Sequence, residues 1–286
     1  MYSNLTSLRT EFKRALDKLY DEREIDNIFF LVLEDLMGID KLLFHSGARE
    51  LTDKEFAEMT GVLKQLQRGR PVQQILGSCV FNGLRFKVNE HILIPRSETE
   101  ELVHWIRSDQ TKMQLQSIWD IGTGSGCIAI SLAKAFPDAT IIASDTSKEA
   151  LSVADSNVVS NEVSGRVALK LHDVLSDNPP ALENLSVIVS NPPYIPVAEK
   201  GAMDVHVTKY EPDLALFVPD DDPLIFYRRI MEIASGILPL GGYVYFELHE
   251  ELALATVDLF NPDHWEVTLK QDMQGKNRML RAERIS

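Results

Sequence analysis

Apolar residues recur at three- and four-residue spacing through the first seventy positions, which is the period of a helix buried on one face. They form two sets, Leu5, Leu8, Phe12, Leu16 and Leu19, then Ile25, Ile28, Phe29, Val32, Leu33 and Leu36. Thr52 and Glu55 have the spacing of a capping box, which predicts the start of a further helix. Gly69-Arg70-Pro71 interrupts the pattern. We therefore predict a helical bundle domain over residues 1–70.

Alternating apolar and polar residues replace the helical period between positions 74 and 94. Asn82-Gly83 is a dipeptide that favours the two-residue turn of a β-hairpin. Apolar residues flank it on both sides, at Ile75-Leu76, Val80-Phe81, Leu84, Phe86 and Val88. We predict a linker hairpin over residues 71–95.

Beyond Pro95, apolar runs of strand length alternate with amphipathic segments of helix length. The predicted strands are 117–121, 140–144, 167–172, 187–190 and 242–248, and the predicted helices are 98–107, 128–136, 148–161, 224–237 and 250–259. This order indicates an α/β fold, a doubly wound, mostly parallel sheet with helices on both faces. Residues 265–270 and 278–284 predict an antiparallel C-terminal hairpin. Residues 96–286 thus form one predicted domain.

Composition narrows the possible functions. A net charge of −14 over 286 residues argues against broad contact with a phosphate backbone, so we expect no direct nucleic-acid binding. The two cysteines, Cys79 and Cys127, have no metal-ligand spacing, and we expect neither a metal site nor a disulfide. No run of residues has the length of a membrane span, and the N-terminal residues lack a signal-peptide core. We expect a cytoplasmic monomer.

A glycine-rich loop joins the first predicted strand of the α/β domain to its helix. The loop reads Asp120-Ile121-Gly122-Thr123-Gly124-Ser125-Gly126. Taken alone, this pattern also fits a tight strand-to-helix turn. A dinucleotide site favours GxGxxG, whereas Asp120 would repel a pyrophosphate and suits a cationic amino-acid group. Asp145 closes the next strand, where it can accept hydrogen bonds from ribose hydroxyls, and Asp173-Val174 follow the third, where an adenine can bind.

The fourth predicted strand runs directly into Asn191-Pro192-Pro193-Tyr194. Prolines fix the backbone and remove donors, so the carbonyl groups of this segment are available as acceptors. The Asn191 side-chain oxygen and the Pro192 carbonyl can accept both hydrogens of a planar NH₂ group, against which Tyr194 can pack. The alternative is a Pro-rich loop that only caps the strand and has no functional role. The position of this segment after a fourth strand, downstream of the glycine loop, favours a binding site for an NH₂ group over that alternative.

Together these features resemble class I methyltransferases and, within them, the bacterial release factor glutamine methyltransferases. Residues 74–77, 84–88, 93–100, 210–216 and 227–230 resemble further segments of that family. The resemblance implies methyl transfer from S-adenosylmethionine, leaving S-adenosylhomocysteine, to the side-chain nitrogen (N5) of the glutamine in the Gly-Gly-Gln motif of peptide chain release factors, and no metal. The helical domain would bind the substrate protein.

The resemblance also assigns roles to residues. The cofactor site would comprise Asp120, Gly122, Thr123, Gly124, Ser125, Gly126, Asp145, Asp173, Val174 and Asn191. The substrate site would comprise Asn191, Pro192, Pro193 and Tyr194, with Asn191, Pro192 and Tyr194 catalytic.

Two residues depart from the family pattern. Ser97 stands where proline is common, and we expect Ser97 to Glu100 to form a capping box instead. His249 stands where a glycine often follows Glu247.

Two other functions remain open. An adenine-amino DNA or RNA methyltransferase can use the same Asn-Pro-Pro-Tyr arrangement on a flipped base. A non-catalytic module that only binds S-adenosylmethionine could retain the fold.

Overall fold

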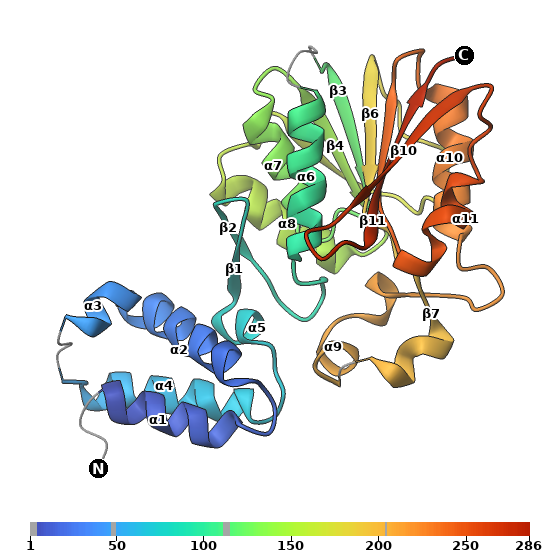
Figure 1. The fold of residues 1–286 in the computed structure, drawn as a ribbon. Coiled ribbons are helices and arrows are strands. Elements are labelled where there is room, and N and C mark those ends of the chain that lie inside the picture. Colours follow the sequence, from blue (N-terminus) through green and yellow to red (C-terminus); the bar gives the residue numbers. More distant parts are fainter. Residues whose placement is uncertain (1–4, 47–49, 111–114, 204) are drawn as a thin grey trace. The chain divides into compact units, whose positions relative to one another are not determined.

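A computed structural model describes residues 5–46, 50–110, 115–203 and 205–286. The chain divides into two compact units (Figure 1). The first is Met1–Gly77 with Asp204–Tyr210, and the second is Ser78–Met203 with Glu211–Ser286. Within the described ranges, no helix combines the length and apolarity needed to cross a membrane.

The first unit is helical, as its periodicity predicts. Its helices are α1 (Leu5–Leu16), α2 (Glu22–Met37), α3 (Lys41–His45), α4 (Asp53–Leu66), α5 (Val72–Leu76) and α9 (Val205–Tyr210). The apolar faces of α1, α2 and α4 share one core, in which Phe12 and Phe29 are fully buried. The predicted capping box is confirmed, since Thr52 and Glu55 exchange hydrogen bonds at the start of α4.

Helical structure extends past the predicted break at residue 70. Ile75-Leu76 lie in α5, not in an extended segment before the hairpin. Gly77 ends this helix with a left-handed φ of 71°, which glycine adopts at little cost. The Gln74 side chain also donates a hydrogen bond to the Tyr210 carbonyl, which ties α5 to α9 within the unit. The alternation of apolar and polar residues could not predict this contact, because Gln74 and Tyr210 are far apart in the sequence.

A seven-stranded sheet forms the centre of the second unit, in the order β10-β11-β9-β6-β3-β4-β5. Its strands are β3 (Ser117–Ile121), β4 (Thr140–Asp145), β5 (Val167–Leu171), β6 (Leu185–Ser190), β9 (Tyr243–Glu247), β10 (Trp265–Gln271) and β11 (Asn277–Arg284). Neighbours pair in parallel from β5 to β9, while β11 pairs antiparallel with both β9 and β10. The predicted fold class and terminal hairpin are confirmed.

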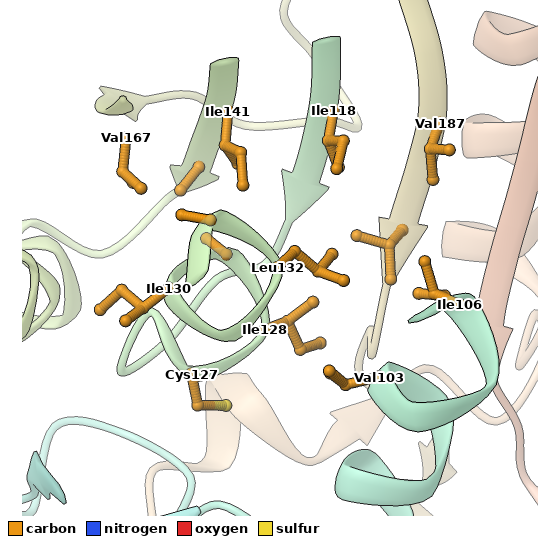
Figure 2. Packing of buried hydrophobic residues seen from close by; sticks show 14 of the residues in the cluster. Val103, Ile106, Ile118, Cys127, Ile128, Ile130, Leu132, Ile141, Val167 and Val187 are labelled. Carbon is orange, nitrogen blue, oxygen red and sulfur yellow. The ribbon is translucent and has the colours of Figure 1, made fainter. Parts of the chain in front are cut away.

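Helices cover both faces of this sheet (Figure 1). They are α6 (Ser97–Asp109), α7 (Cys127–Ala135) and α8 (Lys148–Ser160) on one face, and α10 (Ile225–Ile237) and α11 (Ala253–Val257) on the other. Figure 2 shows Val103 and Ile106 of α6 beside Ile128 and Leu132 of α7, with Ile118 of β3 above them in this view. This packing fixes the carboxyl ends of the central strands along one edge, where α/β proteins bind ligands.

The strands and helices that position this edge agree with the predicted ranges to within two residues, apart from the predicted helix 250–259. That segment is a 3₁₀ turn, Glu250–Leu252, followed by the short α11. Smaller elements complete the unit: β7 (Ile195–Pro196), β8 (Phe217–Val218) and the 3₁₀ turns Val197–Ala202 and Asp213–Ala215.

The predicted hairpin is formed by β1 (Ser78–Phe81) and β2 (Leu84–Lys87). Asn82 and Gly83 both have positive φ, 48° and 73°, as the expected turn type requires. Asn157 of α8 binds the backbone of Lys87 through both its amide oxygen and its amide nitrogen. The hairpin is therefore anchored to the α/β unit.

Candidate active site

A cavity of about 350 Å³ opens at the carboxyl ends of β3, β4 and β6. Ten of the residues predicted for the site line it: Gly122, Thr123, Gly124, Ser125, Asp145, Asp173, Val174, Asn191, Pro192 and Pro193. Three predicted residues, Asp120, Gly126 and Tyr194, are not part of its lining. The cavity lies within the size range of small-molecule sites and is mostly apolar with a few polar groups.

The glycine loop turns sharply because its three glycines all have left-handed φ values, 73° at Gly122, 54° at Gly124 and 80° at Gly126. The amide groups of Gly122 and Thr123 both donate to the Ser144 carbonyl, which holds the loop against the end of β4. A side chain at Gly126 would place its Cβ 3.1 Å from Ile130 Cδ1. Gly126 therefore has a structural role, closing the loop onto α7.

Asp120 lies inside the loop, where its side chain is fully buried. Its Oδ2 accepts hydrogen bonds from Thr123 Oγ1 at 2.6 Å and from the Ala129 amide at 3.2 Å. Its Oδ1 forms no hydrogen bond to any described residue. Burial raises the pKa of this carboxyl to about 7. Asp120 thus supports the loop from within. That it also faces the amino-acid group of a bound cofactor stays a prediction.

Asp145 both lines the cavity and organises the glycine loop. Its Oδ2 accepts a hydrogen bond from the Gly124 amide, and its Oδ1 accepts one from the Ser147 amide, each at 2.9 Å. Burial raises the pKa of Asp145, and the backbone hydrogen bonds from Ser147, Gly124 and Thr146 oppose that shift. An ionised carboxylate has about four acceptor positions, so these backbone bonds leave the Asp145 carboxylate able to accept from a ligand hydroxyl.

Asp173 stands at the third strand end, as predicted, but its carboxylate is partly engaged by its own turn. Oδ1 accepts from the Leu175 amide at 3.0 Å, and Oδ2 accepts from Ser176 Oγ at 2.8 Å. Val174 is buried and contributes an apolar wall. This part of the cavity can accommodate a flat, largely apolar ring.

Asn191 follows β6 at the point where three elements meet. Ser190 of β6 is paired with Phe246 of β9, so the next residues along each strand are Asn191 and Glu247. The Ser190 hydroxyl donates to the Ile121 carbonyl at 2.7 Å and fixes β6 beside β3. Asn191 Nδ2 donates to Thr99 Oγ1 of α6 at 3.1 Å.

Glu247 is 2% exposed and accepts two hydrogen bonds at the back of the site. Its Oε2 accepts from Thr99 Oγ1 at 2.6 Å, and its Oε1 accepts from the Tyr194 hydroxyl at 3.2 Å. Burial raises the pKa of Glu247, while the hydrogen bonds from Thr99 and Tyr194 favour its charged form. The Tyr194 hydroxyl is thus turned toward Glu247, and the substrate-binding and catalytic roles expected of Tyr194 stay predictions.

One wall of the cavity comes from a distant loop that contributes Pro212, Leu214 and Ala215. Glu211, 5% exposed, begins this loop and forms an ion pair with Arg96. Its Oε2 also accepts from the Ile94 amide at 3.0 Å. These bonds hold together residues 93–100 and 210–216, two of the segments that resemble the methyltransferase family in sequence.

Two family models match the chain, the PrmC N-terminal domain over residues 7–77 and the methyltransferase small domain over residues 99–208. The release factor glutamine methyltransferase of Flavobacterium psychrophilum is 42% identical over 285 residues, spanning 97% of this chain and 98% of that protein. The chain belongs to the release factor glutamine methyltransferase family. A second member, from Bacteroides thetaiotaomicron, is 38% identical and spans 95% of this chain and 97% of its own length.

A more distant solved structure shares only the fold of these methyltransferases. It is the hMettl16 catalytic domain in complex with a MAT2A 3′UTR hairpin, 16% identical, with a TM-score of 0.55 and 94% of each chain covered.

The two departures from the family pattern have different structural outcomes. The capping box predicted at Ser97 is wrong, because Arg96 is the residue that precedes α6 and makes no side-chain cap. Glu100 instead accepts a hydrogen bond from the Asn82 amide of the hairpin turn at 2.6 Å. His249 stands in place of the glycine common in the family. Its ring packs edge-on against the Tyr194 ring, with 5.9 Å between the two ring centroids.

Sequence reasoning did not select Thr99, Glu247 or Glu211. Glu247 could have been found, because it is an acidic residue at the carboxyl end of a predicted strand, as Asp120 and Asp145 are. Thr99 and Glu211 carry no local signal, since their partners lie 148 and 115 residues away in the chain.

Proposed function

We propose that this protein methylates the side-chain nitrogen of a glutamine presented by a peptide chain release factor, using S-adenosylmethionine. The observation that carries this proposal is Asn191, a cavity-lining amide whose nitrogen is held by Thr99. Its carbonyl oxygen is therefore the group left to accept a hydrogen from a substrate NH₂. The activity named for the relatives in this family supports the same reaction.

The residues of the glycine loop fit the proposed cofactor. Gly122 has no side chain, so a ligand can approach its backbone closely; a Cβ there would lie 3.9 Å from the Asn191 backbone carbonyl oxygen. The Asp145 carboxylate suits the ribose hydroxyls, and Val174 suits the face of the adenine. When bound, S-adenosylmethionine supplies an electrophilic methyl group, and its transfer to nitrogen leaves S-adenosylhomocysteine and one proton, which water can take up.

Positioning is the main contribution that these residues make to the reaction. An amide nitrogen is a poor nucleophile because its lone pair is delocalised into the carbonyl group. Asn191 Oδ1 and the Pro192 carbonyl can each accept one of its hydrogens, which orients the nitrogen and stabilises positive charge as it develops. The pair Pro192-Pro193 stiffens this segment, so the acceptors are held in place before the substrate arrives.

The helical unit offers a candidate surface for the release factor. A groove on it is lined by Asn27, Phe30, Leu31, Glu34, Asp40, Lys41 and Leu42. Leu42 is 80% exposed and Leu31 is 39% exposed. A single glutamine side chain offers little binding energy, so recognition of a folded substrate protein needs contacts remote from the reacting atom.

The decisive experiment offers the purified full-length protein and methyl-labelled S-adenosylmethionine three substrates in parallel. These are an intact release factor, its variant with alanine in place of the Gly-Gly-Gln glutamine, and double-stranded DNA. Label on the wild-type factor alone is the expected result. Label on DNA would instead support the adenine methyltransferase alternative, and label on the alanine variant would exclude the proposed glutamine. Cofactor binding without label on any substrate would support the non-catalytic alternative.

A further inference from the structure

Behind Asn191, a chain of hydrogen bonds crosses three elements of the α/β unit. It runs from Asn191 Nδ2 to Thr99 Oγ1 over 3.1 Å, and from Thr99 Oγ1 to Glu247 Oε2 over 2.6 Å. Thr99 and Glu247 are 3% and 2% exposed, so water does not compete freely for these groups. Tyr194 donates to the other carboxylate oxygen and completes the chain.

The direction of this chain follows from the protons available to each group. An ionised carboxylate only accepts, so the single hydroxyl proton of Thr99 is directed to Glu247. Thr99 Oγ1 can then only accept from Asn191, and the Asn191 group that faces it must be the NH₂ end of the amide. The carbonyl end, Oδ1, is thereby directed away from Thr99.

We propose that Thr99 and Glu247 are positioning residues that hold the Asn191 amide in its catalytic orientation. This inference rests on the proposed function and deepens it, because the orientation determines which substrates can react. With the amide reversed, Nδ2 would meet the substrate NH₂ donor to donor, and one of the two acceptors needed to orient the nitrogen would be lost. Glu247 thus acts on the substrate only through Thr99 and Asn191.

Substitutions at Thr99 test the proposal because they can remove the hydroxyl with little change in shape. Thr99→Val is nearly isosteric, and we expect it to lower kcat on the release factor about tenfold, the effect of one hydrogen bond lost at a buried group. Thr99→Ser keeps the hydroxyl and should retain kcat to within about threefold of the wild type. The KM for the release factor and the Kd for S-adenosylhomocysteine should change little in either variant.

Several outcomes would overturn the positioning role. One is a Thr99→Val protein with wild-type kcat, and another is a loss confined to KM or to cofactor affinity. If Thr99→Val does not fold, Thr99→Ser and Thr99→Ala form a second pair that differs only in the hydroxyl group. Equal kcat values in that pair would also exclude the proposed hydrogen-bond chain.

A spectroscopic measurement on the protein alone separates this inference from the proposed function. The side-chain NH₂ signals of Asn191 in a ¹⁵N-correlated NMR spectrum can be assigned by their absence from Asn191→Ala. Thr99→Val should shift these signals, whereas Thr99→Ser should leave them close to their wild-type positions. Unshifted signals in Thr99→Val refute the hydrogen-bond chain. If the wild-type protein fails to methylate the release factor, the proposed function is refuted, but the NMR result on the hydrogen-bond chain is unaffected.

Discussion

Asp145 provides a direct test of the cofactor site, because its side chain both lines the cavity and holds the glycine loop. In the protein alone, its carboxylate accepts hydrogen bonds from the amides of Gly124 and Ser147. In the proposed complex, it also accepts from the ribose hydroxyls. Hydrogen bonds to a charged group contribute about 1.5–3 kcal/mol each. Asp145→Ala removes the ribose contacts and also loosens the loop that forms the cavity floor.

We therefore expect Asp145→Ala to weaken S-adenosylmethionine binding by about 1–3 kcal/mol, which is a Kd roughly fivefold to 150-fold higher. Isothermal titration of the cofactor into the free protein measures this directly. Glu149→Ala is the matched control. Glu149 also lines the cavity and carries the same charge, but it is exposed and does not bind the glycine loop. Its removal should leave the Kd nearly unchanged.

Two results would refute the assignment of Asp145. The first is a Kd for Asp145→Ala within about twofold of the wild type, which is less than the loss of one charged hydrogen bond. The second is an equal loss in Glu149→Ala, which would show that only the net negative charge of the cavity matters. Circular dichroism of both variants establishes whether the fold is retained.

Four further predictions concern the chemistry, the loop, the buried acid and the partner. Asn191→Ala should lower kcat about a hundredfold or more while the S-adenosylhomocysteine Kd changes little; near-normal turnover would remove Asn191 from the catalytic role. Gly126→Ala should reduce the free energy of unfolding by about 1–3 kcal/mol in urea titrations, because φ is 80° and Ile130 is close; Gly165→Ala, where a Cβ meets nothing within 4 Å, should not. The folded state keeps the Asp120 proton up to about pH 7, whereas the unfolded chain releases it near 3.8. The free energy of unfolding should therefore fall by roughly 4 kcal/mol as the pH rises through that window, and Asp120→Asn should lack this fall. Unfolding free energies that change equally with pH in the wild type and in Asp120→Asn would contradict a protonated Asp120 in the folded state. Leu42→Glu should raise the KM for the release factor but not the cofactor Kd, and an unchanged KM would exclude this groove as the contact surface.

Local sequence was sufficient to predict the long helices of both units and the strands of the central sheet. The helical periodicity of residues 5–36, the Asn82-Gly83 turn and the strand-helix alternation after Pro95 all depend on contacts between near neighbours in the chain. The glycine loop and Asn191-Pro192-Pro193-Tyr194 were also recognisable, because parallel strands place their carboxyl ends along a common edge whatever the details of packing. Hence ten of the residues that line the cavity could be predicted from the sequence.

Tertiary structure alone decided what each of these residues faces. The sequence pattern could not show that Asp120 lies under the loop while Asp145 reaches the cavity, since both are carboxylates at strand ends. Nor could it pair Thr99 with Glu247, because α6 and β9 meet only once the sheet order brings β9 beside β6. The same holds for the Arg96–Glu211 ion pair that anchors the cavity wall. Side-chain direction and long-range hydrogen bonds depend on packing across the whole sheet, which no local pattern records.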